Sequence, residues 1–169
     1  MAAIRRAEAI WEGTLRGGEG HVTAQSSGVF EHLPVTWASR TEAADKTSPE
    51  ELIAAAHASC FAMALSLEIE KAGAKPRRLE VTAAVAFDKT PAGYRIVSSD
   101  LEVGGIVDGL DAARFAEIAR AAKEGCPVSQ ALKGNVKIDV EAALGGPETT
   151  EKPRSARSPA DRSEGKLPS

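Results

Sequence analysis

The order of the expected elements predicts an α+β fold class with antiparallel sheet for this chain of 169 residues. An apolar run at 48–73 is typical of one long helix that packs on several sides. Apolar residues recur at every second position over 79–88, as in a half-buried strand, and residues 94–103 suit its antiparallel partner. Strands precede the long helix, and a hairpin, more helices and a last strand follow it.

The first part of the chain is expected to form short strands. Residues 4–15 suit a first strand, and the RGGEG sequence at 16–20 suits a hairpin turn. A return strand is expected at 21–25 and a third strand around 35–38. Arg40 follows this third strand and lies in the connection to the long helix.

The long helix carries recognisable signals at both ends. Ser48 can cap it, and Glu51 stands three residues later, which is the spacing of a capping box. Pro49 suits the first helical position, where its missing N–H costs nothing. Glu50 adds negative charge at the positive end of the helix dipole, and Gly73 is a suitable stop.

Two shorter helices and a last strand are expected after the hairpin. Asp108 or Asp111 can cap a helix at about 111–124. A short helix should follow at 127–132, with proline at its first position. Alternating apolar residues at 136–142 predict the last strand.

Composition divides the chain into a folded domain, 1–145, and a tail, 146–169. The tail holds four of the nine prolines and a single large apolar residue, Leu167, so we expect it to be disordered. The net charge of −3 argues against a nucleic-acid partner or an anionic membrane surface. No apolar run is expected to span a bilayer, and the N-terminus lacks the apolar segment of a secretory signal. A cytoplasmic location is therefore expected.

Cys60 and Cys126 are the only cysteines and the main candidates for chemistry. A cysteine in an apolar helix, like Cys60, is often a small hydrophobic core residue. Cys126 precedes a proline at an expected helix N-terminus, where backbone N–H groups stabilise a thiolate. In a reducing compartment, disulfides are usually catalytic or redox-sensing. A catalytic or redox-sensing role is therefore conceivable for both cysteines.

His57 lies three residues before Cys60 and shares its helix face. A Cys–His nucleophilic pair and a metal site with Cys126 are both conceivable. Two thiols and one imidazole are an incomplete zinc set, however. We therefore expect His57 to be a packed or hydrogen-bonded residue.

A thiolate in an apolar helix needs a nearby cation, and arginine is the suitable one. Arg40 and Arg16 are the candidates, and Glu50 or Glu51 could orient such an arginine, although capping of the helix already explains both glutamates. Glu50 and Cys60 are separated by about 15 Å along a helix that rises ~1.5 Å per residue. One active site with both residues would therefore need a second, antiparallel copy of the helix, and hence a homodimer.

Two segments resemble motifs of the OsmC/Ohr family, the osmotically inducible protein C and organic hydroperoxide resistance proteins. TSPEELIAAAHASCFAMALSLEIEKAG, at 47–73, resembles the central helix of the family, and AKEGCPVSQALKGNVKIDV, at 122–140, resembles its second cysteine motif. WEG at 11–13, GYRI at 93–96 and the last strand match in order, so the resemblance covers roughly residues 4–142. AAHASCF and GCPVSQALK resemble the OsmC branch more than the Ohr branch.

The resemblance implies an OsmC-like fold with antiparallel sheets around two central helices, intertwined as a homodimer. It implies a thiol-dependent peroxidase in which Cys60 is the peroxidatic cysteine and Cys126 the resolving one. Glu50 matches the glutamate that holds an arginine over the reactive thiol. For that arginine the resemblance implies Arg40, since WASRTE at 37–42 stands where the OsmC branch has its aromatic-x-x-Arg segment. The Ohr branch takes its arginine from the first hairpin, where this chain has Arg16.

The implied reaction needs no metal, flavin or haem. Cys60 attacks a peroxide oxygen and becomes a sulfenic acid, and Cys126 condenses with it to a disulfide. A dithiol, for which a lipoyl group is one candidate, then reduces the disulfide by exchange. An apolar pocket around Phe61 and Met63 would favour organic hydroperoxides over hydrogen peroxide. The alternatives are a redox-sensing or small-ligand-binding dimer without turnover, and a Cys–His hydrolase.

Overall fold

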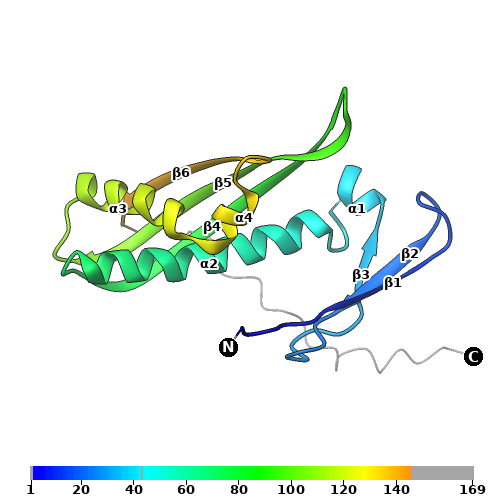
Figure 1. Ribbon diagram of the computed structural model, residues 1–169, viewed down its shortest axis with the longest axis horizontal. Helices are drawn as coiled ribbons and strands as arrows, with labels where there is room; N and C mark the ends of the chain where they lie inside the picture. Colours follow the sequence, from blue (N-terminus) through cyan, green and yellow to red (C-terminus); the bar gives the residue numbers. More distant parts are fainter. Residues whose placement is uncertain (1, 43, 146–169) are drawn as a thin grey trace, which may run out of the picture.

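The computed structural model describes residues 2–42 and 44–145 (Figure 1). The tail expected at 146–169 lies outside the described residues. In chain order the described elements are β1 (Glu8–Glu12), β2 (Glu19–Thr23), β3 (Leu33–Thr36), α1 (Ala38–Thr41), α2 (Pro49–Lys71), β4 (Lys75–Thr90), β5 (Gly93–Asp108), α3 (Ala112–Gly125), α4 (Pro127–Leu132) and β6 (Lys137–Leu144).

The strands form two sheets, in the orders β1-β2-β3 and β4-β5-β6, which confirms the α+β class. The first sheet and the β4–β5 pair are antiparallel, as predicted. β6 instead runs parallel to β5, so the larger sheet is mixed. α3 and α4 cause this difference, because they carry the chain back across the sheet before β6 begins.

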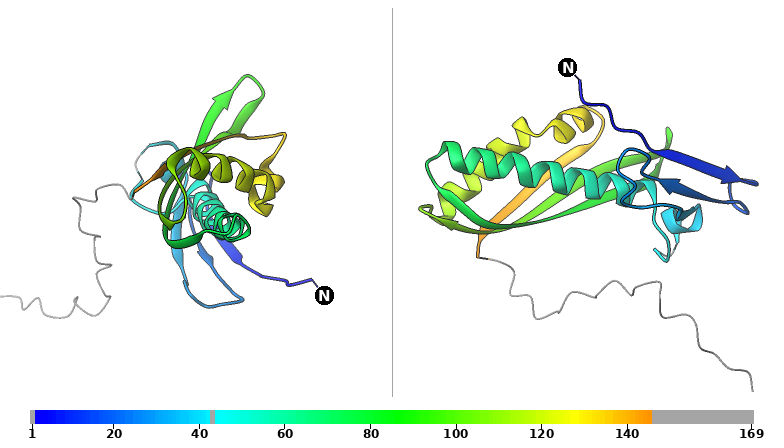
Figure 2. Two further views of the ribbon diagram at one scale, coloured as in Figure 1. Left: turned by 90° about the vertical axis from the view of Figure 1, so that its left-hand side faces the viewer. Right: turned by 90° about the horizontal axis from the view of Figure 1, so that it is seen from below.

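The long helix α2 begins as the sequence predicts. Ser48 caps it, since its Oγ accepts a hydrogen bond from the Glu51 N–H at 3.2 Å, and Pro49 is the first helical residue. α2 lies along the larger sheet with α3 and α4 beside it, so the three helices cover one face (Figures 1 and 2).

The core lies between these helices and the larger sheet. Asp111 caps α3 by accepting from the Arg114 N–H at 2.8 Å, which settles the choice between two capping aspartates. The fully buried large side chains of the core come from α2, α3 and β5: Phe61, Leu65, Ile69, Phe115 and Leu101. On β5, Gly105 leaves space for Phe115, because a Cβ there would lie 2.6 Å from its Cζ.

α2 buries only part of its apolar surface within this chain. Met63 is 68% exposed and Leu67 is 51% exposed, on the face that does not contact the sheet. By length and composition α2 could also cross a membrane, with a mean hydropathy of 1.7, contrary to the expectation that no segment could. The core helix of a water-soluble protein can have the same length and apolar composition.

The smaller sheet lies beyond the N-terminal end of α2 (Figure 1). All five residues of β1 are exposed, including Ile10 and Trp11. The expected third strand at 35–38 ends earlier, at Thr36, and a helical turn begins at Ala38. The Thr36 Oγ accepts a hydrogen bond from the Ser39 N–H at 3.2 Å, which favours the turn over a longer strand.

Candidate active site

The fold brings the two thiols into direct contact. Cys60 lies in the middle of α2, and Cys126 is the residue between α3 and α4. Cys60 packs against the core cluster that includes Cys126, and each thiol shifts the pKa of the other. Neither cysteine is in a disulfide. Cys60 is half-buried and Cys126 is completely buried. Both therefore occupy a single site, which the sequence alone left open.

The environment of Cys60 disfavours its thiolate. Burial raises the pKa of Cys60, and the neighbouring Cys126 raises it further, although the Val128 N–H acts in the opposite direction. Among the described residues, no arginine or lysine contributes to lowering this pKa. Within one chain, Cys60 thus lacks the cation that a reactive thiolate needs.

Cys126 has the opposite tendency. Burial alone would raise the pKa of Cys126, but hydrogen bonds outweigh this effect and lower it. The groups that lower it are the backbone N–H and hydroxyl of Ser129, the Cys60 thiol and the Val128 N–H. The surroundings of Cys126 in the single chain thus favour its thiolate.

His57 is completely buried and bonded on both sides of its ring. Its Nδ1 lies 2.7 Å from the Ser99 Oγ, and its Nε2 lies 2.8 Å from the Ser129 Oγ. The prediction of a hydrogen-bonded histidine is confirmed. Because serines occupy both nitrogens, a Cys–His pair with Cys60 is not formed. Desolvation by burial lowers the pKa of His57, which favours the neutral ring.

Sequence reasoning did not identify Ser99 or Ser129. Ser129 carried a usable signal, because it follows Cys126 by three residues across the start of a helix, where side chains meet. Ser99 had none, since it is one polar residue in a long strand. Its place in the site depends on how α2 packs against β5.

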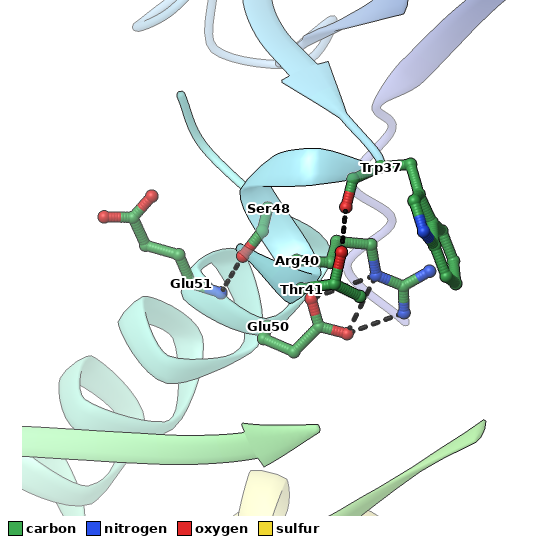
Figure 3. Close-up of polar contacts among 6 residues, drawn as sticks. All are labelled: Trp37, Arg40, Thr41, Ser48, Glu50 and Glu51. Carbon is green, nitrogen blue, oxygen red and sulfur yellow. Dashed lines mark hydrogen bonds and ion pairs between the residues drawn. The ribbon is translucent and has the colours of Figure 1, made fainter. Parts of the chain in front are cut away.

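Arg40 and Glu50 form a second pair, at the N-terminal end of α2 (Figure 3). The Arg40 Nη2 lies 2.7 Å from the Glu50 Oε1, and the Arg40 Nε lies 3.2 Å from each carboxylate oxygen. The guanidinium also lies 4.2 Å from the centroid of the Phe87 ring and 5.5 Å from that of Trp37. The carboxylate and the aromatic rings hold Arg40 in one position.

Arg16, the other candidate arginine, lies in the exposed turn after β1. It forms no ion pair within the described part of the chain, and it lines a different surface cavity, together with Glu12 and Glu19. The contact with Glu50 that the resemblance implies is therefore made by Arg40.

Within one chain the two pairs are separate. A cavity of about 330 Å³ is lined by Arg40, Glu50 and Phe87, and Cys60 is not among its lining residues. Ten helical residues separate Glu50 from Cys60, a rise of about 15 Å. Across residues 2–42 and 44–145, no group of three or more His, Cys, Asp and Glu residues could hold a metal ion.

The chain resembles known proteins over nearly all of its described length. The model of a family described as OsmC-like protein matches residues 42–141. Peroxiredoxin OsmC of Escherichia coli is 43% identical over 141 residues, which cover 83% of this chain and 98% of that protein. The organic hydroperoxide resistance protein OhrB of Bacillus subtilis is 32% identical over 136 residues, which cover 76% of this chain and 93% of that protein.

Solved structures show the same fold. The crystal structure of the Bacillus subtilis OhrB protein matches with a TM-score of 0.65 and 28% identity, covering 81% of this chain and 97% of that one. The identity to Escherichia coli OsmC exceeds that to OhrB, which agrees with the wording of both cysteine motifs. The chain belongs to the OsmC-like protein family, within the OsmC branch of the OsmC/Ohr group.

Proposed function

We propose that the protein is a thiol-dependent peroxidase that reduces organic hydroperoxides through Cys60 and Cys126. The observation that carries this proposal is the proximity of two free thiols, one on α2 and one at the start of α4, which pack in the same cluster and shift each other's pKa. The names of the relatives, a peroxiredoxin and an organic hydroperoxide resistance protein, support the same activity. A cytoplasmic location fits a reaction that returns both thiols to the reduced form.

In the first half of the reaction, the Cys60 thiolate attacks the terminal oxygen of the hydroperoxide. The O–O bond breaks, Cys60 becomes a sulfenic acid, and the alkoxide takes a proton and leaves as an alcohol. This step needs a positive group that stabilises the thiolate and the developing alkoxide. Arg40 is the group we assign, with Glu50 as the residue that holds it in place.

The positions of these residues require a second copy of the chain. Glu50 lies about 15 Å along α2 from Cys60 and holds Arg40 of α1 beside it, so the pair does not reach the thiol of its own chain. An antiparallel α2 from a second copy would place its Arg40 over Cys60. The exposed face with Met63 and Leu67 supplies apolar surface for this packing. We therefore propose a homodimer with two composite sites.

In the second half of the reaction, Cys126 attacks the sulfenic sulfur of Cys60. An S–S bond forms, the S–O bond breaks, and water leaves with the proton of Cys126. A dithiol, of which a lipoyl group is one candidate, reduces the disulfide by exchange. Organic hydroperoxides are the preferred substrates, because Phe87 and Val85 give the cavity beside Arg40 apolar walls. Hydrogen peroxide lacks a group that these walls would bind.

Intact mass spectrometry tests the redox cycle. One equivalent of cumene hydroperoxide should remove two hydrogens from the protein, with a linkage that maps to Cys60 and Cys126 and is reversed by dithiol. The Cys126→Ser variant should instead gain oxygen at Cys60 and lose turnover with dithiol. If both thiols remain free after treatment with cumene hydroperoxide, the peroxidase proposal is contradicted and a ligand-binding dimer is favoured.

A mixing experiment tests the composite site. Cys60→Ser lacks the thiol and Arg40→Ala lacks the arginine, so each variant alone should have little activity. A mixture refolded together should recover about a quarter of the wild-type rate, because half of the dimers are mixed and each holds one intact site. A mixture as inactive as its components would show that Arg40 and Cys60 do not meet across an interface.

A further inference from the structure

His57 is a buried titratable residue that the reaction above does not use. The ring is completely buried and lies between two serines that are themselves buried, Ser99 on β5 and Ser129 on α4. Buried polar groups cost stability unless each is hydrogen-bonded, and an apolar residue would fill this space at lower cost. Three buried polar side chains, those of Ser99, His57 and Ser129, are thus joined by hydrogen bonds.

This chain of hydrogen bonds leads toward the resolving thiol. The Ser129 Oγ lies 2.8 Å from the Nε2 of His57, and Ser129 follows Cys126 by three residues at the start of α4, where its hydroxyl lowers the pKa of Cys126. A neutral imidazole has one donor and one acceptor nitrogen, and a serine hydroxyl has one proton to donate. The direction of each hydrogen bond thus fixes the direction of the next.

When Cys126 is a thiolate, only one arrangement satisfies every group. The Ser129 hydroxyl donates to the sulfur, so its oxygen must accept from His57, and the proton of the ring must be on Nε2. Nδ1 is then an acceptor, and the Ser99 hydroxyl donates to it. The spacings on the two sides of the ring, 2.7 and 2.8 Å, suit the two hydrogen bonds of His57 in this arrangement.

We propose that His57 is a positioning residue for the resolving step, which it serves by turning the Ser129 hydroxyl toward the sulfur of Cys126. The inference rests on the proposed peroxidase function. In the step it serves, Cys126 loses its proton and attacks the sulfenic sulfur of Cys60. The S–S bond forms as the S–O bond breaks, and the displaced hydroxide takes the proton and leaves as water.

Other charged groups around the ring do not replace this role. Cys60, on the same helix, and Cys126 are the titratable groups of the site. Among the described residues, no charged side chain contributes to the shift in the pKa of His57, whose cause is burial. Lys123 of α3 points toward β6, where its Nζ donates to the Ile138 carbonyl at 3.3 Å, and Glu50 lies two turns away along α2.

Two serine variants separate positioning from a structural effect. Ser129→Ala and Ser99→Ala each remove one buried hydrogen bond to His57, so their losses of stability should be similar. Only Ser129→Ala removes a donor from Cys126. Stopped-flow measurement of disulfide formation should show a slowing of about tenfold in Ser129→Ala and a clearly smaller effect in Ser99→Ala.

Variants of His57 itself provide a rescue test. A glutamine at 57 places an amide donor near the Nε2 position, and an asparagine places one near the Nδ1 position. His57→Gln should therefore keep most of the rate of disulfide formation, whereas His57→Asn should lose it. Loss of peroxide in the same samples reports oxidation of Cys60, so a failure of the peroxidase step is seen separately.

A titration that needs no turnover completes the test. In a Cys60→Ser background, the ultraviolet absorbance of the thiolate should show that Ser129→Ala raises the pKa of Cys126 and that Ser99→Ala raises it less. Equal effects of the two serine variants on this titration and on disulfide formation would overturn the proposal. So would an equal loss of rate in His57→Gln and His57→Asn.

Discussion

The Arg40 guanidinium is fixed on two sides, by the Glu50 carboxylate at 2.7 Å and by the Phe87 ring at 4.2 Å. Glu50 is nearly buried, whereas Arg40 keeps part of its side chain exposed. A charge held this way is oriented before substrate arrives, which is the condition for strong stabilisation of a transition state.

Arg40→Ala should slow the oxidation of Cys60 by organic hydroperoxide by at least about tenfold, because the thiolate loses its cation. Arg16→Ala is the matched control, since Arg16 is exposed and forms no ion pair within the described residues. Peroxide consumption under single-turnover conditions measures both rates. An unchanged rate in Arg40→Ala, or a larger loss in Arg16→Ala, would assign the role to the other arginine.

Phe87→Leu should slow the same step by about two- to fivefold, since a cation–π contact is worth roughly 0.5–1 kcal/mol at a partly exposed site. Leucine keeps the apolar wall but has no ring face for the guanidinium. Phe87→Tyr keeps the face and should retain the rate. If the Phe87→Leu and Phe87→Tyr variants have equal rates of Cys60 oxidation, the ring contributes volume only and does not orient Arg40.

Stability should depend on pH through His57. Its pKa in the folded protein is lowered by burial from an ordinary value of 6.5, so the unfolded chain binds a proton first as the pH falls. The contribution of His57 to stability is therefore complete above pH 6.5 and is lost as the pH falls toward the lowered value. Urea denaturation should show a free energy of unfolding that declines by up to about 1.4 kcal/mol per pH unit in this range.

His57→Gln is the control for that titration, because glutamine has no proton to gain in this range. The difference between wild type and variant should shrink as the pH falls below 6.5. A difference that stays constant down to pH 5 would contradict a lowered pKa for His57.

Gly105→Ala should destabilise the fold by about 1–3 kcal/mol, as expected for overpacking. The added Cβ would lie 2.6 Å from the Phe115 Cζ, inside a packed core. Gly125→Ala is the control, because a Cβ at the end of α3 meets nothing within 4 Å. Thermal denaturation compares the two variants, and an equal midpoint for both would show that the core can shift to admit the methyl group.

The sequence was sufficient for the elements that have a strong local signal. The cap at Ser48, Pro49 at the first position and the apolar run of α2 are local features, and the helix begins where they predict. The direction of β6 has no local signal, because alternating residues look the same in either direction. α1 is four residues long, too short to show a helical period.

The candidate site likewise contains some residues that the sequence identifies and others that only the fold brings in. Cys60 and Cys126 stand out by residue type and by their motifs, yet their contact depends on how the crossover through α3 and α4 packs on α2. Phe87 lies on the inward face of a predicted strand, but nothing in the sequence pairs it with Arg40. Ser99 joins His57 from a strand far along the chain, and only the folded structure shows it.

The parallel strand β6 also bears on the order of folding. Antiparallel hairpins such as β4–β5 form early from local contacts, whereas a parallel pair must wait until the intervening segment has closed a long loop. Cys126 lies inside that segment, so it reaches Cys60 only after α3 and α4 have docked. Until then the two thiols of a nascent chain lie apart, so the pairing of Cys60 with Cys126 is a property of the completed fold alone.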